Sequence, residues 1–296
     1  MAWESERRAR LGVPAFAGGV LYVLSGIILS ATLKNAPTVG VLQGIAPALR
    51  GVPDPLVSPR AGEVRFASEH AFGLLVGSVL QALALAILIV VLLFLLQSVS
   101  FRRPEVPPAA RPLVLFGGGA FAAAGLVAQI VRTIQTHAFA VGHDFSNHAV
   151  EEALTPTAYV VVELLGLLVG IVFAAGMVIV VLNAMRVGLL VRWMGMLGIV
   201  MAVLVFTPFG IFFGGALPSL LVAFWMVGLG ILLLGRWAGG DPPGWAAGEA
   251  RPWPTAAERT GARRGGSGEA AEVVPEPAQV GTGSSARNRR KRGARG

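Results

Sequence analysis

The sequence predicts an all-α fold, a six-helix bundle of an integral membrane protein followed by a disordered C-terminal tail. Between Leu11 and Trp237 lie six apolar segments, each about as long as a bilayer core, which needs about 20 helical residues. The stretch from Trp193 to Gly235 contains no charged residue. Charged residues make up 14% of the chain and hydrophobic residues 54%, whereas soluble domains have about 25% charged residues.

We expect the membrane domain to occupy residues 1–237. The expected spans are about 13–33, 71–97, 113–134, 158–182, 191–207 and 217–236. The first is long enough to be an uncleaved signal anchor, because the apolar region of a signal peptide has only about 7–15 residues. The last two come from one uncharged run, which Pro208, Pro218 and neighbouring glycines break into a hairpin.

Small residues at four-residue spacing favour close contacts between these helices. Examples are the pairs Gly73/Gly77 and Gly166/Gly170 and the run 117–119. Helices in lipid associate through close packing and hydrogen bonds. We interpret these residues as packing within one chain, with a dimer interface as the alternative.

Residues 238–296 are expected to form a disordered basic tail, since large apolar residues nearly vanish there. Its end carries a cluster of cations: Arg287, Arg289, Arg290, Lys291 and Arg292. Beside a membrane, such a cluster is a candidate for binding anionic lipid headgroups. Nucleic acid is not an expected partner, because no nucleic-acid-binding fold or interleaved aromatic residue accompanies the cluster. A solvated tail that helps to fix topology is the alternative.

The distribution of arginine predicts orientation. The N-terminal segment, the connections 98–112 and 183–192, and the tail are rich in Arg, and the positive-inside rule places such segments in the cytoplasm. We expect both termini to be cytoplasmic. Only two of the 24 basic residues are Lys, a bias that, with the abundance of Ala, Gly and Val, suggests a GC-rich bacterial genome and so a bacterial plasma membrane.

Several kinds of chemistry are excluded or unsupported. The chain has no cysteine, which excludes disulfides, thiolate nucleophiles and cysteine-ligated metal sites. It has no P-loop, no dinucleotide-binding glycine motif after a strand and no GxSxG elbow. We therefore expect a non-enzymatic, multi-pass membrane protein without a cofactor. It would act through packing, through contact with partners or through its outer loop.

Glu163 is the one acidic residue inside an expected span. A carboxylate in hydrocarbon is costly, which makes it a candidate functional group. The third span ends near Arg132 and the fourth returns past Glu163, so we expect an ion pair near the outer boundary. We interpret that pair first as structural, closing the hairpin. The alternative is a proton or cation site in a small transporter or proton-coupled carrier, with Gln81 and Gln129 as further candidate residues.

The outer loop before the fourth span concentrates polar groups. Its candidate residues are His137, His143, Asp144, His148, Glu151 and Glu152. Imidazole and carboxylate groups bind zinc and other transition metals, and His titrates near neutral pH. An extracytoplasmic metal or pH sensor is thus one alternative function. The spacing matches no named metal motif, so we interpret the segment first as a solvated polar loop.

One connection carries a family resemblance. Residues 183–199 and the apolar hairpin that ends at 232–235 resemble the second half of an uncharacterised bacterial six-span family. That family has a similar R-x-G-L-L-x-R-x-x-G-x-L-G connection between its fourth and fifth spans. The matching positions are Arg186, Gly188, Arg192, Gly195 and Gly198. The resemblance implies six helices in the membrane and no known activity.

Overall fold

The computed structural model describes residues 2–40, 42, 49–51, 57–142, 144–206, 216–238 and 240–253. Within these ranges every regular element is a helix, which confirms the all-α prediction for this part of the chain. The helices are α1 (Ala2–Leu33), α3 (Ala61–Glu69), α4 (Ala71–Arg102), α5 (Ala110–Pro112), η1 (Leu113–Gly117), α6 (Gly118–Gly142), α7 (Asn147–Leu154), α8 (Thr157–Arg186), α9 (Arg192–Val205), α10 (Ala216–Leu233) and α11 (Pro243–Ala247).

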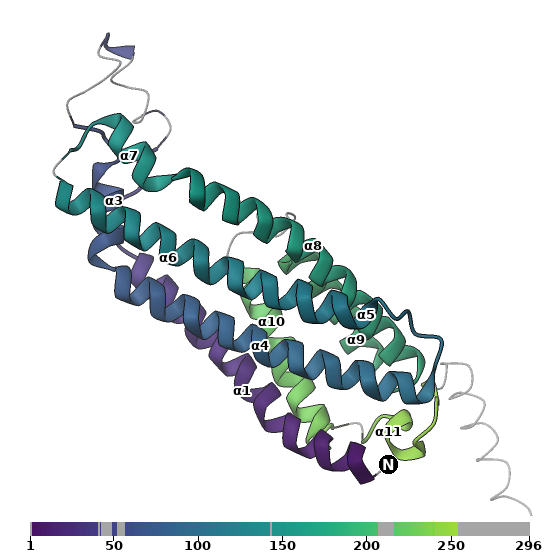
Figure 1. Ribbon diagram of the computed structural model, residues 1–296. Helices are drawn as coiled ribbons and strands as arrows, with labels where there is room; N and C mark the ends of the chain where they lie inside the picture. The colour runs from purple at the N-terminus through teal and green to yellow at the C-terminus, as the bar shows by residue number, and fades with distance from the viewer. Residues whose placement is uncertain are drawn as a thin grey trace, which may run out of the picture. The chain divides into compact units, whose positions relative to one another are not determined.

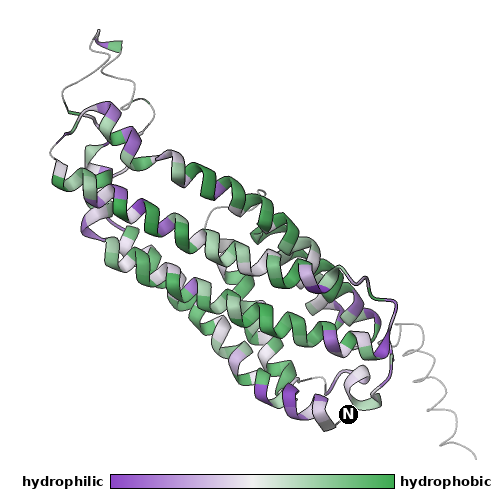
Figure 2. Ribbon diagram, viewed as in Figure 1, coloured by the Kyte–Doolittle hydropathy of each residue, from purple (hydrophilic) through white to green (hydrophobic). Residues whose placement is uncertain are grey.

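Four helical segments are long and apolar enough to cross a membrane. They are Trp3–Leu33, Ala71–Arg102, Ala110–Gly142 and Asn147–Arg186. The apolar helices α9 and α10 are shorter. Figure 2 shows apolar residues along the middle of the long helices and polar residues gathered near their ends.

Helix α1 lies between α4 and α10, with which it shares its most extensive contacts (Figure 1). Small residues bring these helices close together. A Cβ atom at Gly77 of α4 would lie 2.6 Å from Leu29 Cγ of α1, and Ser25 Oγ donates a 2.8 Å hydrogen bond to the Gly77 carbonyl. On the other side, a Cβ atom at Gly230 of α10 would lie 2.6 Å from the backbone nitrogen of Phe16. Several of the small residues found in the sequence thus serve packing within the chain.

Helix α6 continues the helical run that starts at α5 and passes through η1. Pro112 stands just before η1, a π-helical turn. Proline lacks an N–H and disturbs the regular helical ladder, and a π turn is one way to absorb that disturbance. A Cβ atom at Gly117 would lie 2.9 Å from the backbone nitrogen of Phe173, so α8 packs directly against η1.

The main core joins α1, α4, α8, α9 and α10. Phe206 lies between two aromatic rings, with ring centroids 4.8 Å from Phe173 and 5.4 Å from Phe121. Trp225 of α10 is fully buried and donates a 2.9 Å hydrogen bond from Nε1 to the Met194 carbonyl. The connection between α9 and α10, residues 207–215, lies outside the described residues.

The helices end in two differently built regions. We call the first the α7 end, where α3 and α7 pack on the end of α6 (Figure 1). Its buried side chains form a small separate cluster: Ala61, Val64, Phe139, Val150, Ala153 and Leu154. Asp144 and Ser146 shape the start of α7. Ser146 Oγ accepts a hydrogen bond from the Ala149 N–H as the N-cap of the helix.

The second region, the Arg102 end, contains the start of α1 and the end of α4. Arg102 contacts Glu4 through two hydrogen bonds, of 2.5 and 3.0 Å, and their side chains are 1% and 10% exposed. The Arg102 guanidinium also donates to the Gly244 carbonyl. Arg8 forms a second pair with Asp241, at 2.6 Å. Charged groups therefore connect α1 to α4 and to the segment that follows α10.

Residues 240–253 correct the predicted start of the disordered tail. The sequence indicates disorder from residue 238, yet this segment is ordered and packs on the turn between α8 and α9. The Gly244 N–H donates to the Gly188 carbonyl, and Trp245 and Trp253 donate from Nε1 to the carbonyls of Leu189 and Leu190. Two tryptophans thus provide specific tertiary contacts, which the polar composition of the segment did not predict. Residues 254–296, with the basic cluster at their end, lie outside the described residues.

Candidate functional site

A cavity of about 510 Å³ opens between α4, α6 and α8, beside the end of α9. Its wall is built mainly from apolar residues, many of them small, such as Ala124, Gly125 and Gly166. The polar side chains that line it are Ser78, Gln81, Gln129, Tyr159 and Glu163. The cavity therefore joins Glu163 to both glutamines that the sequence suggested as its companions.

Glu163 is held by a neighbour on its own helix. Tyr159 Oη donates a hydrogen bond of 2.6 Å to Glu163 Oε1, a length typical of a bond to an ionised carboxylate. The two residues are four positions apart on α8 and therefore lie on the same face. Tyr159 is half-buried and Glu163 is exposed along the cavity wall, so the tyrosine fixes one carboxylate oxygen and leaves the group accessible.

Arg132 lies near this arrangement but is not in direct contact with the carboxylate. Among the described residues, none of the ion pairs within 4.0 Å joins it to Glu163. Its Nε atom is buried without a hydrogen-bond partner. Both Arg132 and Glu163 act electrostatically on the Tyr159 hydroxyl. Within the described ranges, the Glu163 carboxylate is therefore bound by Tyr159 instead of forming the expected ion pair with Arg132.

The two glutamines differ in how they are held. Gln81 of α4 donates a 3.1 Å hydrogen bond to Tyr22 Oη of α1, which fixes its amide. Gln129 of α6 donates a 3.3 Å hydrogen bond to Thr133 Oγ1 on the next turn. An amide has two donors and an acceptor, so each retains hydrogen-bonding capacity that a ligand can use.

This donor set favours an organic ligand over a bare metal ion. Ligand pockets are mostly apolar, with a few polar groups that fix orientation, and here a single carboxylate supplies the negative charge. A divalent ion with hard oxygen ligands takes six or more of them. In the part of the chain that is described, no group of three or more His, Asp or Glu side chains is arranged to hold a metal.

The histidine-rich segment at the α7 end is only partly described. His137 ends up exposed in the last turns of α6, while His148, Glu151 and Glu152 are exposed on α7. Asp144 accepts a 3.0 Å hydrogen bond from the Ser146 N–H, and this bond lowers the pKa of its carboxyl group, with a smaller contribution from His148. His143 lies outside the described residues. The metal or pH sensor therefore stays a prediction.

The sequence prediction did not include Tyr159, which the structure places in contact with Glu163. The spacing of four positions from Glu163 was the available indication, because residues so spaced are neighbours on a helix. The contact of Gln81 with Tyr22 had no such indication, since the two residues are 59 positions apart.

Comparison with known proteins gives no relative: no family model, no curated protein and no solved structure matches this chain.

Proposed function

We propose that the chain is a six-span integral protein of a bacterial plasma membrane. In this proposal it binds a small organic cation in the cavity between α4, α6 and α8, without acting as an enzyme. The main observation in support of this binding site is the position of Glu163 in a cavity whose other lining residues are apolar or neutral.

The apolar side chains on the surface of the long helices support a location in a membrane. Leu164, Leu165 and Leu168 of α8 are all exposed, as is Phe116 beside α6. Soluble monomers rarely expose large contiguous apolar surfaces, whereas lipid is the natural environment of such faces. The shorter helices α9 and α10 complete the six spans as the hairpin expected from the uncharged run.

The proposed orientation has both termini in the cytoplasm. The pair between Arg8 and Asp241 brings the start of α1 and the segment after α10 to the same end, which supports an even number of crossings. Arg102, Arg103 and Arg111 belong to this end too, in agreement with the positive-inside rule.

The chemistry of the cavity favours a cation with an apolar body. Glu163 provides one negative charge, while Gln81, Gln129 and the alanines and glycines provide neutral surface. In a site of low dielectric constant a single charge pair discriminates strongly between a charged ligand and its neutral analogue. Tyr159 orients the carboxylate before a ligand arrives.

The test is equilibrium binding of tetraphenylphosphonium to the detergent-solubilised protein, with neutral triphenylphosphine oxide as the comparison. Glu163→Gln removes the charge but keeps an acceptor for Tyr159. We expect the affinity for the cation to fall about tenfold or more, which corresponds to about 1.4 kcal/mol, while the neutral compound binds equally to both proteins.

Glu105→Gln is the matched control, because Glu105 is an exposed carboxylate outside the cavity. It should bind the cation like the parent. Absence of binding to the parent, or equal affinity of the parent and Glu163→Gln, would contradict the proposal.

Transport of such a cation is the second candidate function, because the carboxylate lies among long apolar helices, where intramembrane charges commonly mark substrate paths. Tetraphenylphosphonium itself crosses lipid bilayers, so uptake of a less permeant organic cation, tetraethylammonium, into proteoliposomes distinguishes a carrier from a receptor. A carrier accumulates the probe only with Glu163 intact, whereas a receptor binds it without accumulation above protein-free liposomes.

A further inference from the structure

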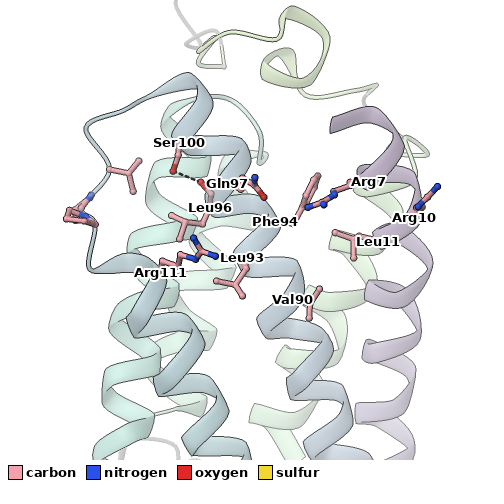
Figure 3. Close-up of a pocket in the computed structure, with 13 residues that line it drawn as sticks. Arg7, Arg10, Leu11, Val90, Leu93, Phe94, Leu96, Gln97, Ser100 and Arg111 are labelled. Atoms are coloured by element: carbon pink, nitrogen blue, oxygen red, sulfur yellow. Dashed lines mark hydrogen bonds between the residues drawn. The ribbon is translucent and has the colours of Figure 1, made fainter. Parts of the chain in front are cut away.

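A second and larger cavity lies at the Arg102 end, with a volume of about 710 Å³. Its walls come from the start of α1, the last turns of α4 and the connection 106–111 (Figure 3). It shares no lining residue with the cavity around Glu163.

The charges that line this cavity are all positive: Arg7, Arg10 and Arg111. Figure 3 shows Arg7 on α1 and Arg111 before α6 reaching toward the same part of α4, whereas Arg10 points away. Arg10 pairs with Glu6 at 2.6 Å. In the described chain Arg7 and Arg111 have no acidic partner within 4.0 Å.

Neighbouring acidic groups are already engaged with other arginines. Glu4 is buried against Arg102, and Glu105 contacts Arg103 at 3.4 Å. Arg7 is positioned by the Trp3 ring, with its guanidinium carbon 4.7 Å from the ring centroid, a contact that leaves its charge uncompensated. The cavity thus presents two guanidinium groups to an anion.

The cavity wall also contains apolar side chains beside these arginines. The apolar lining residues include Leu11 of α1 and Val90, Leu93 and Phe94 of α4. Figure 3 shows Val90 and Leu93 farther from the Arg102 end than Gln97 and Ser100. The cationic rim and apolar wall together match an amphiphile with an anionic head and a hydrocarbon tail. Guanidinium groups recognise phosphate oxygens through paired hydrogen bonds.

We infer that this cavity binds one anionic phospholipid, with its phosphate between Arg7 and Arg111 and an acyl chain along Leu11, Leu93 and Phe94. The inference goes beyond the cation site and rests only on the membrane location proposed above. It also differs from the expected headgroup contact of the basic tail, because it assigns a site within the helices to a single lipid.

Native mass spectrometry of the full chain in a non-ionic detergent tests the assignment. Dioleoylphosphatidylglycerol, dioleoylphosphatidylcholine, dihexanoylphosphatidylglycerol and inorganic phosphate are added separately to the parent protein. We expect discrete binding of the dioleoyl anionic lipid, at least about fivefold weaker binding of the zwitterionic lipid, and much weaker binding of the short-chain lipid and of phosphate.

The variant Arg7→Gln/Arg111→Gln should weaken binding of the anionic lipid about tenfold or more, because each arginine near an anionic group contributes about a factor of five. Arg186→Gln/Arg236→Gln is the control. It removes the same charge from exposed residues of the same end that do not line the cavity, and it should bind like the parent.

The inference is overturned if the double arginine variant and its control bind the lipid equally, or if phosphatidylcholine binds as well as phosphatidylglycerol. Equal binding of inorganic phosphate would assign the cavity to a soluble anion instead. The lipid series uses the parent protein, so failure of phosphatidylglycerol to bind in preference to phosphatidylcholine overturns the inference even if the variant does not fold. None of these measurements depends on Glu163. If the proposed cation site is wrong, they therefore still test the lipid site.

Discussion

The two ends of the helices are stabilised in opposite ways. At the Arg102 end, buried or partly buried charges connect segments far apart in the chain, as Arg102 does with Glu4 and Gly244. At the α7 end, a small apolar cluster provides the packing, and the ion pair between Arg60 and Glu63 is local and partly exposed. A buried charge is costly unless it is fully paired, so the Arg102 end tolerates substitution less than the α7 end.

The largest effect is expected from Arg102→Leu. It leaves the Glu4 carboxylate buried without a partner and the Gly244 carbonyl without its donor, at a cost of about 3–5 kcal/mol. Thermal unfolding of the detergent-solubilised protein should show a marked fall in Tm. Combination with Glu4→Gln should restore part of it, because the uncompensated charge is removed.

Arg103→Leu is the control for this change, since Arg103 is the adjacent arginine and has only a loose contact with the exposed Glu105. Its effect on Tm should be small. If the two arginine variants lowered the Tm equally, the buried pair would stabilise the protein no more than the exposed one. The contrast between the two ends would then be wrong.

A smaller and local effect is expected at the α7 end from Val150→Ala. Val150 is buried in the small cluster, and loss of two methyl groups costs about 1–2 kcal/mol. Because the cluster is separate from the main core, hydrogen exchange should increase in α7 without a change in the long helices.

Val161→Ala, an exposed position on α8, should leave the exchange of α7 unchanged. If Val150→Ala instead increased exchange throughout the helices, the α7 end would be part of the same cooperative unit as the Arg102 end.

The smallest effect concerns pH. The hydrogen bonds from Arg8 lower the pKa of the Asp241 carboxyl group. A carboxyl group whose pKa is lower in the folded state stabilises that state above its unfolded pKa of about 3.9 and loses this contribution as the pH falls toward the folded value. Because the pair is partly exposed, the contribution is below about 1 kcal/mol.

The measurement is the difference in Tm between the parent and Asp241→Asn from pH 7 to pH 3. We expect the parent to be slightly more stable at pH 7 and the difference to become smaller as the pH falls toward 3. A difference that does not change with pH would show that Asp241 acts through its shape rather than its charge.

The helix content of the chain follows closely from local sequence. The uncharged run that starts at Ala71 fixes α4, and Pro156 precedes the start of α8, since both features act within a few residues. What could not be predicted depends on tertiary contacts. The turn between α8 and α9 does not reveal that Gly188, with φ of +76°, lies against the backbone of Arg251, a contact that explains one glycine of the family-like motif.

The candidate site was predictable to a similar extent. The carboxylate Glu163 stood out because it is an acidic residue in an apolar run, and Gln81 and Gln129 were nearby polar residues. The placement of Arg132 depended on the rotation of α6 about its axis, which the spacing of residues in a highly apolar helix does not determine. For that reason the all-helical fold was predictable, whereas the contact of Glu163 with Tyr159 was not.

The pair between Arg8 and Asp241 has a consequence for the order in which the protein assembles. Its two residues are separated by 233 positions, and α1 has its most extensive contacts with α10. During synthesis the first helix therefore leaves the ribosome long before its principal neighbour exists. Glu4 can meet Arg102 once α4 is made, 98 residues later, but the Arg102 end closes only when Asp241, Gly244 and Trp245 have been translated. Truncation within 240–253 would thus leave the earliest helix of the chain without its final contacts.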